Sequence, residues 1–124
     1  MLGFRVLNRQ QKVTAAQIAA YLDLPVATIS DAMQRMSAGG AALKPLHAGG
    51  YMAGAALTVK CRPGDNLMVH YALNIAQPGD VIVVDAGGDL TNAIVGELML
   101  AYAAKKQLAG VVINGAVRDS HSIR

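Results

Sequence analysis

The sequence predicts an α/β domain, and three features of the chain lead to that prediction. Segments with helical spacing of apolar residues alternate with short apolar runs of the kind found in buried parallel strands. Clusters of glycine, proline and aspartate separate these segments and are typical of turns. The chain has 124 residues, 53% of them hydrophobic, which suits one domain with a sizeable core. We therefore expect a single domain over residues 1–124, with about residues 1–40 forming a helical segment packed on its core.

The N-terminal segment is predicted to hold a pair of helices. Thr14 can cap a helix over residues 14–22, because Gln17 follows it three positions later as in a capping box. Pro25 suits the first turn of a second helix over about residues 26–36.

Part of this helical pair, residues 18–33, resembles the helix-turn-helix of LacI-type repressors. A recognition helix must meet phosphates and bases, yet the second predicted helix has no basic residue before Arg35. We therefore expect two structural helices and no DNA binding, with a DNA-binding factor as the alternative.

The rest of the chain predicts strands and helices in alternation, so that the full order is helix, helix, strand, helix, strand, helix, strand. Alternating or continuous apolar residues indicate the strands, and apolar residues at helical spacing indicate the helices. Gly110 is expected to end the last helix. The predicted strands cover residues 55–61, 81–84 and 111–117, and the predicted helices cover residues 66–76 and 94–108.

Composition narrows the class of protein. The net charge is +3 and the basic residues are scattered, so no basic tail for nucleic acid is present. Cys61 is the one cysteine, which fits a reducing compartment. The sequence shows no signal-peptide pattern and no apolar run long enough to span a membrane, so we expect a soluble, cytoplasmic protein. Charged residues make up only 15%, against about 25% in average domains, which favours an oligomer.

Two features could carry chemistry. The predicted strand over residues 111–117 ends in Arg118 and Asp119, and ligands of α/β proteins sit at the carboxyl ends of strands. Arginine can bind a carboxylate through two hydrogen bonds, and aspartate can hold a hard divalent cation. The other feature is the helix start near residues 96–99, where unpaired backbone amides form an anion site. The alternative for Arg118 and Asp119 is a surface ion pair. The alternative for the helix start is an ordinary capped turn, with Asp85 or Asp89 near its start.

The histidines and the cysteine are weaker candidates for a functional site. The three histidines, His47, His70 and His121, lack the spacing of metal ligands, and we expect His70 to be packed in the core or an interface. Cys61 is expected to be a buried strand residue.

Several motifs together resemble the RraA-like family, which includes the regulator of ribonuclease E activity A and class II pyruvate aldolases such as 4-hydroxy-4-methyl-2-oxoglutarate aldolase. The matching motifs are Arg118-Asp119, the helix start at 96–99, Gly-Ala-Ala-Leu-Thr-Val at 54–59, and Pro-Gly-Asp at 63–65 and 78–80. The resemblance covers residues 31–119. It implies a swivelling β/β/α domain, a homotrimer or hexamer, and an active site at a subunit interface.

The resemblance also implies roles for particular residues. Twenty residues separate Glu97 from Arg118, which is the spacing between the acid and the Arg-Asp pair in the family's enzymes. By this match Asp119 would hold Mg²⁺ or Mn²⁺, Arg118 would contact the pyruvyl unit, and Glu97 would position water or the metal. The backbone amides at Gly96, Glu97, Leu98 and Met99 would hold the substrate carboxylate.

The implied activity is cleavage of a 4-hydroxy-2-oxo acid to pyruvate, with oxaloacetate decarboxylation as a side activity. The alternative is a non-catalytic RraA-type protein that binds an RNA-degrading enzyme. The chain departs from the family pattern in two ways. Ser122 stands where an acid is frequent, and family members continue beyond this point, so we expect a chain that is short at its C-terminus.

Overall fold

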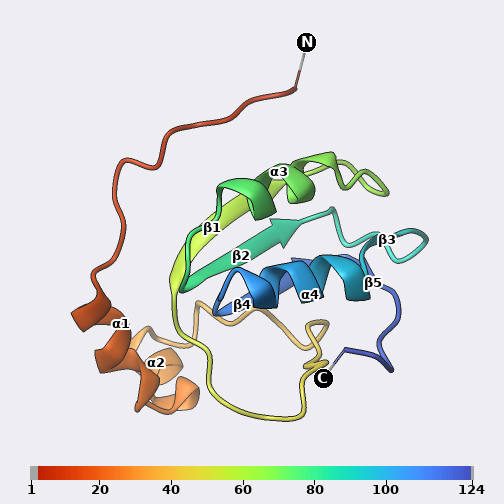
Figure 1. Cartoon of the computed structure of the whole chain (residues 1–124). Coiled ribbons are helices and arrows are strands. Elements are labelled where there is room, and N and C mark those ends of the chain that lie inside the picture. Colours follow the sequence, from red (N-terminus) through yellow and green to blue (C-terminus); the bar gives the residue numbers. More distant parts are fainter. Residues whose placement is uncertain (1–2, 124) are drawn as a thin grey trace.

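The fold is an α/β arrangement of four helices and five strands in the computed structural model, which describes residues 3–123 (Figure 1). This confirms the predicted fold class. In chain order the elements are α1 (Ala15–Leu22), α2 (Val26–Ala32), β1 (Ala55–Lys60), α3 (Leu67–Ile75), β2 (Asp80–Asp85), β3 (Ala93–Val95), α4 (Glu97–Lys105), β4 (Gly110–Asn114) and β5 (Ala116–Val117).

The centre of the molecule is a parallel three-stranded sheet in the order β1–β2–β4. Helices α3 and α4 connect its strands and lie on the same face of it (Figure 1). Strands β3 and β5 form a separate parallel pair beyond the carboxyl ends of the sheet strands. Two chain segments that follow the central sheet therefore run side by side.

The core lies between the sheet and these two helices. Ile82 and Val84 of β2 are buried, as are Val69 and Leu73 of α3, and Ile82 has no exposed surface. Strand residues two apart share a face, so the apolar run of β2 supplies the core at every second position. The remaining positions point to the other face.

That other face of the sheet is partly open. Thr58, Val83 and Val112 lie in register across it, with Thr58 exposed and the two valines half-buried. A hollow of about 530 Å³ lies over them and is bounded by Leu43. Parallel sheets are normally covered on both faces, so this surface is unusually accessible for its type.

A buried ion-pair cluster ties the extended N-terminal segment to the sheet. The Asp80 side chain has no exposed surface, and both of its oxygens accept hydrogen bonds from Arg9 at 3.0 Å. Lys12 lies 2.9 Å away, and the backbone N–H of Gln77 donates at 2.9 Å. Burial alone raises the pKa of Asp80, but these hydrogen bonds outweigh it and hold the pKa at about 2. We call Arg9, Lys12 and Asp80 the N-terminal clasp.

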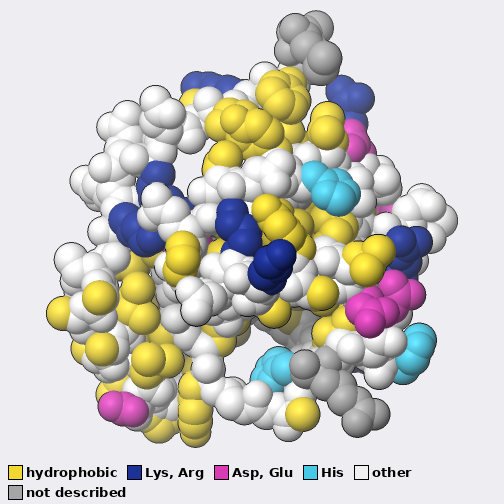
Figure 2. Space-filling model, viewed as in Figure 1, with side chains coloured by type: hydrophobic (Ala, Val, Ile, Leu, Met, Phe, Trp, Pro, Cys, Tyr) yellow, Lys and Arg dark blue, Asp and Glu magenta, His cyan; other side chains and the backbone are white. Residues whose placement is uncertain are grey.

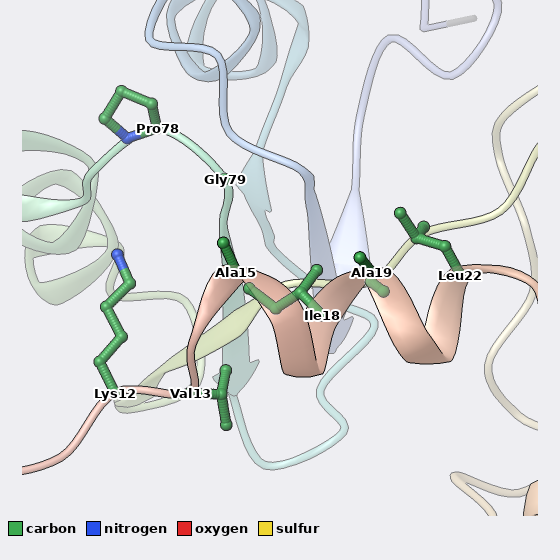
Figure 3. Close-up of a pocket in the computed structure, with 9 residues that line it drawn as sticks. Lys12, Val13, Ala15, Ile18, Ala19, Leu22, Pro78 and Gly79 are labelled. Carbon is green, nitrogen blue, oxygen red and sulfur yellow. The ribbon is translucent and has the colours of Figure 1, made fainter.

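The helical pair follows the N-terminal clasp. Thr14 and Gln17 form the predicted capping box at the start of α1. A pocket of about 330 Å³ lies between α1, with Ile18 and Leu22, and the turn at Pro78–Gly79. Figure 3 shows the residues that line it. Neither α1 nor α2 has a buried residue, and hydrophobic side chains gather over this part of the surface (Figure 2).

The second helix is shorter than predicted. It ends at Ala32 instead of near residue 36, because Gln34 and Arg35 adopt left-handed backbone angles (φ 59° and 57°). Arg35, the basic residue that follows α2 most closely in the sequence, pairs with Asp31 at 2.8 Å on the exposed surface.

Two predicted elements were wrong at their boundaries. The helix expected over residues 94–108 begins only at Glu97, because residues 93–95 form β3, and it ends at Lys105 before the left-handed Gln107 instead of at Gly110. The strand expected over residues 111–117 is broken at Gly115, and its last two residues join β5 in the other sheet. Pairing between β3 and β5 overrides the local pattern at the start of this helix and at the break in this strand. Within residues 3–123, no helix is long and apolar enough to cross a membrane.

Candidate active site

The parallel pairing of β3 with β5 brings the two predicted site segments together. Val95 is in register with Val117, and the backbone N–H of Arg118 donates to the Val95 carbonyl at 3.0 Å. The next residue on the first strand is Gly96, after which α4 begins at Glu97. Glu97 and Arg118, which have twenty residues between them in the sequence, therefore follow strands that lie side by side in the fold.

The Asp119 carboxylate lies against the start of α4. Its Oδ2 atom accepts a hydrogen bond from the backbone N–H of Glu97 at 3.4 Å, which is longer than the usual 2.7–3.2 Å. The Nε atom of Arg118 lies 3.6 Å from the same oxygen. The Arg118 side chain is 73% exposed and that of Asp119 is 42% exposed, so both can reach a ligand from solvent.

Gly96 is needed here for space. A Cβ atom at this position would lie 2.9 Å from both the Arg118 Nε and the Asp119 Oδ2 atoms. Its φ of −141° is ordinary extended backbone that any residue adopts, so conformational freedom is not the reason for glycine. Because Gly96 has no side chain, Arg118 and Asp119 can lie directly over the N-terminus of α4.

The turn after β5 presents the Asp119 side chain. Asp119 has a left-handed backbone (φ 61°), which aspartate and asparagine tolerate better than most residues. The backbone N–H of Ser122 donates to the Asp119 carbonyl at 2.9 Å and closes the turn. The predicted end of the strand is thus a true reversal of the chain.

The start of α4 also presents backbone donors. Its first internal hydrogen bond runs from Leu100 to the Gly96 carbonyl, so the amides of Glu97, Leu98 and Met99 lie before the helical pattern begins. Asp119 faces the first of these amides, and among residues 3–123 no acceptor faces the other two. Such amides attract anions, and the Asp119 carboxylate occupies part of the place expected for a substrate carboxylate.

The donor set fits a hydrated metal ion. Mg²⁺ keeps several waters and commonly takes one or two protein carboxylates, and the half-exposed Asp119 offers one. In the described part of the chain, no three His, Cys, Asp or Glu side chains gather in a way that could hold a metal. Asp119 could therefore offer one carboxylate to a hydrated divalent ion, and the Arg118 Nε atom lies 3.6 Å from the same oxygen.

Other candidate residues lie outside this arrangement. Cys61 is buried in the core as predicted, and burial, reinforced by Asp65 and Asp85, raises the pKa of its thiol. His70 is exposed on α3, so the prediction of a packed core position was wrong for the single chain. Asp89 accepts hydrogen bonds from the backbone N–H groups of Thr91 and Asn92, as in an ordinary turn, and does not cap α4.

Two comparisons with known sequences point to the same kind of protein. The sequence model of the family described as RraA-like, Aldolase/RraA, matches residues 26–124. A protein of Halalkalibacterium halodurans, provisionally named 4-hydroxy-4-methyl-2-oxoglutarate aldolase, is 42% identical over 102 residues. The match covers 82% of this chain and 49% of that protein, so the chain spans about half the length of this curated relative.

Solved structures share the fold. The RNA-processing inhibitor RraA from Thermus thermophilis is 31% identical with a TM-score of 0.72, over 82% of this chain and 62% of that one. A protein from Geobacillus kaustophilus HTA426, described as S-adenosylmethionine: 2-dimethylmenaquinone methyltransferase, is 30% identical with the same TM-score, over 81% and 62%. The names of these relatives describe different activities, so the likeness carries the fold and not a single reaction.

Proposed function

The chain belongs to the RraA-like family, and on this premise we propose that it is a divalent-metal-dependent class II aldolase. Its substrate would be a 4-hydroxy-2-oxo acid, cleaved to pyruvate, with decarboxylation of oxaloacetate as a side activity. The observation that carries the proposal is the convergence of Arg118, Asp119 and the Glu97 amide at one point over Gly96.

Each residue of the site would have a separate role in the reaction. Asp119 would hold the Mg²⁺ or Mn²⁺ ion, which when bound acts as a Lewis acid on the 2-oxo acid. The amides of Leu98 and Met99 would bind the substrate carboxylate at the helix N-terminus. These contacts orient the bond between C3 and C4 for cleavage.

Arg118 and Glu97 would act on the charges that the cleavage creates. When the C3–C4 bond breaks, its electron pair passes to the pyruvate unit and forms an enolate, whose negative charge the Arg118 guanidinium would stabilise. The C4 hydroxyl loses its proton to water and becomes a carbonyl. The exposed Glu97 side chain would position that water, and protonation of C3 then completes pyruvate.

Replacement of the metal-holding carboxylate tests the proposal. The variant Asp119→Asn keeps a residue suited to the left-handed backbone, so it isolates the loss of charge. We expect pyruvate release from 4-hydroxy-4-methyl-2-oxoglutarate to fall by about a hundredfold or more, and EDTA to have the same effect until Mg²⁺ or Mn²⁺ is restored. The control is Asp31→Asn, an exposed acid on α2. Turnover of Asp119→Asn at the level of the unaltered protein would contradict the proposed role.

The role of Arg118 is tested separately. Arg118→Ala removes one charge-stabilising donor, for which we expect a loss of about 2–4 kcal/mol in transition-state stabilisation. The measurement is kcat/KM for pyruvate release under saturating metal. An unchanged kcat/KM would remove Arg118 from the mechanism.

The second candidate is regulation of an RNA-degrading enzyme. The likeness to the RNA-processing inhibitor RraA supports it, because that match covers 82% of this chain, as the match to the aldolase relative does, at 31% against 42% identity. Its test is RNA cleavage by a purified ribonuclease E in the presence of the chain. Slowed cleavage together with no metal-dependent pyruvate release would favour this candidate over the aldolase.

We also propose that the protein assembles as a homotrimer or hexamer. The low share of charged residues, 15%, and the partly open sheet face both support burial of surface between copies. Light scattering after size exclusion measures the assembly, and a monomeric mass would contradict it.

A further inference from the structure

Three polar side chains line up across the carboxyl end of the central sheet. Lys60, Asp85 and Asn114 are the last residues of β1, β2 and β4, and they lie in register with one another. The Lys60 ammonium pairs with Asp85 Oδ2. Asn114 Nδ2 donates to Asp85 Oδ1 at 3.0 Å. We call these three residues the strand-end row.

Asp85 also binds the segment that leaves β2. Its Oδ1 atom accepts a hydrogen bond from the backbone N–H of Gly87 at 2.9 Å. The backbone adds two links, because the N–H groups of Ala86 and Gly88 donate to the Asn114 carbonyl at 3.0 and 3.1 Å. One carboxylate oxygen therefore joins the first residues after β2 to the last residue of β4.

Both joined segments lead to the candidate active site. The chain after Gly87 runs through the loop to β3 and reaches the start of α4 at Gly96–Glu97. The chain after Asn114 bends at Gly115 and enters β5, which delivers Arg118 and Asp119. The bend is tight, since a Cβ atom at Gly115 would lie 2.9 Å from the Cβ of Ala86.

We propose that Asp85 is a positioning residue, which sets the spacing of the two segments that carry the candidate active site by linking Gly87 to Asn114. The inference rests on the proposed function for its catalytic consequence, but the positioning itself is independent of any reaction. Asp85 touches neither Arg118 nor Asp119 in the hydrogen bonds of the described residues, so it acts through the backbone.

The exposure of the strand-end row argues for positioning rather than stability. The Lys60 side chain is 73% exposed and that of Asp85 is 49% exposed, and exposed ion pairs contribute little to folding. The hydrogen bonds from Lys60, Gly87 and Asn114 hold the pKa of Asp85 at about 2. Asp85 therefore stays ionised, and its hydrogen bonds stay intact, at any pH suitable for an assay.

The test compares Asp85→Ala, Asn114→Ala and their double variant with Asp89→Ala. Asp89 is the matched control, because it lies in the same loop and accepts hydrogen bonds from two backbone amides without reaching β4. The first measurement is the ¹H–¹⁵N spectrum of the full chain, followed at the amides of Glu97 and Asp119. The second is kcat/KM for pyruvate release, together with the midpoint of thermal unfolding.

We expect Asp85→Ala and Asn114→Ala to shift the two site amides and to lower kcat/KM by about tenfold, less than the hundredfold loss of a 1 Å displacement. The double variant should be no worse than either single variant, since both break one link. Asp89→Ala should leave the site amides and kcat/KM unchanged. If Asp85→Ala does not fold, Asn114→Ala carries the comparison, because it removes the donor to Asp85 Oδ1 and leaves the carboxylate in place.

Unchanged site amides in Asp85→Ala would overturn the inference, and so would strictly additive losses or equal losses in Asp89→Ala. Absence of pyruvate release from the unaltered protein would instead contradict the proposed function. In that case the amide shifts still decide whether Asp85 positions the two segments.

Discussion

Replacement of Gly96 by alanine probes the convergence of Arg118 and Asp119 without removing a reacting group. The added methyl group would lie 2.9 Å from the Arg118 Nε and Asp119 Oδ2 atoms, whereas ordinary contacts begin near 3.4 Å. The two side chains must therefore move apart by about 0.5 Å or more. The long hydrogen bond of 3.4 Å between the Glu97 amide and Asp119 would then be lost.

The magnitude follows from this displacement. A misplacement of about 1 Å costs about a hundredfold in rate, so we expect kcat/KM to fall by about ten- to a hundredfold, or about 1.4–2.7 kcal/mol. Stability should change by only about 1 kcal/mol, because the backbone of Gly96 suits any residue and both side chains can relax into solvent.

The assay is pyruvate release over a range of substrate and Mg²⁺ concentrations, with thermal unfolding measured in parallel. Ala101→Ser is the matched control, because it changes an exposed position further along α4. Wild-type kcat/KM in Gly96→Ala would refute the argument that Arg118 and Asp119 act from above the helix start. A collapse of the thermal midpoint would refute the claim that Gly96 serves the site and not the fold.

Three further predictions concern the fold. Asp80 has a folded-state pKa of about 2, below the unfolded value near 3.9, so its contribution to the free energy of unfolding is complete above about pH 5 and is lost as the pH falls towards 2. Urea unfolding should show this loss, about 2 kcal/mol, in the unaltered protein. The variant Asp80→Asn should not show it. Ile82→Ala should lower the free energy of unfolding by about 2–5 kcal/mol, because Ile82 is fully buried, and a loss under 1 kcal/mol would contradict its place in the core. Thr14→Ala should cost α1 about 0.5–2 kcal/mol, seen as faster hydrogen exchange at Gln17, while equal exchange in both proteins would count against the capping box.

Most of the fold could be predicted from local sequence. The boundaries of β1, β2 and α3 follow from apolar spacing and from turn residues that lie beside them in the chain. The errors at β3 share one cause with the late start of α4, since Ile94 and Val95 satisfy helical spacing as well as they satisfy a strand. Only pairing with β5, more than twenty residues later in the chain, selects the strand. Pairing between distant segments is the information that local spacing lacks.

The residues of the candidate site could be predicted from the sequence, but not all of their contacts. The spacing of Glu97 and Arg118 with the family resemblance named the residues, and the parallel pairing of β3 with β5 places them together. The contact of Asp119 with the Glu97 amide could not be predicted, because it depends on the left-handed turn after β5. The link through Asp85 also escaped prediction, since its partners come from two other strands and from the loop after β2.

The N-terminal clasp shows that the folded domain and the segment matched by the family model begin at different residues. The family model begins at residue 26, yet Arg9 and Lys12 lie before it and supply the cations around the buried Asp80. A fragment trimmed to residues 26–124 would keep the whole matched sequence and lose both cations that pair with the Asp80 carboxylate. The folding unit therefore extends further towards the N-terminus than the segment matched by the family model, and expression of the domain should begin before Arg9.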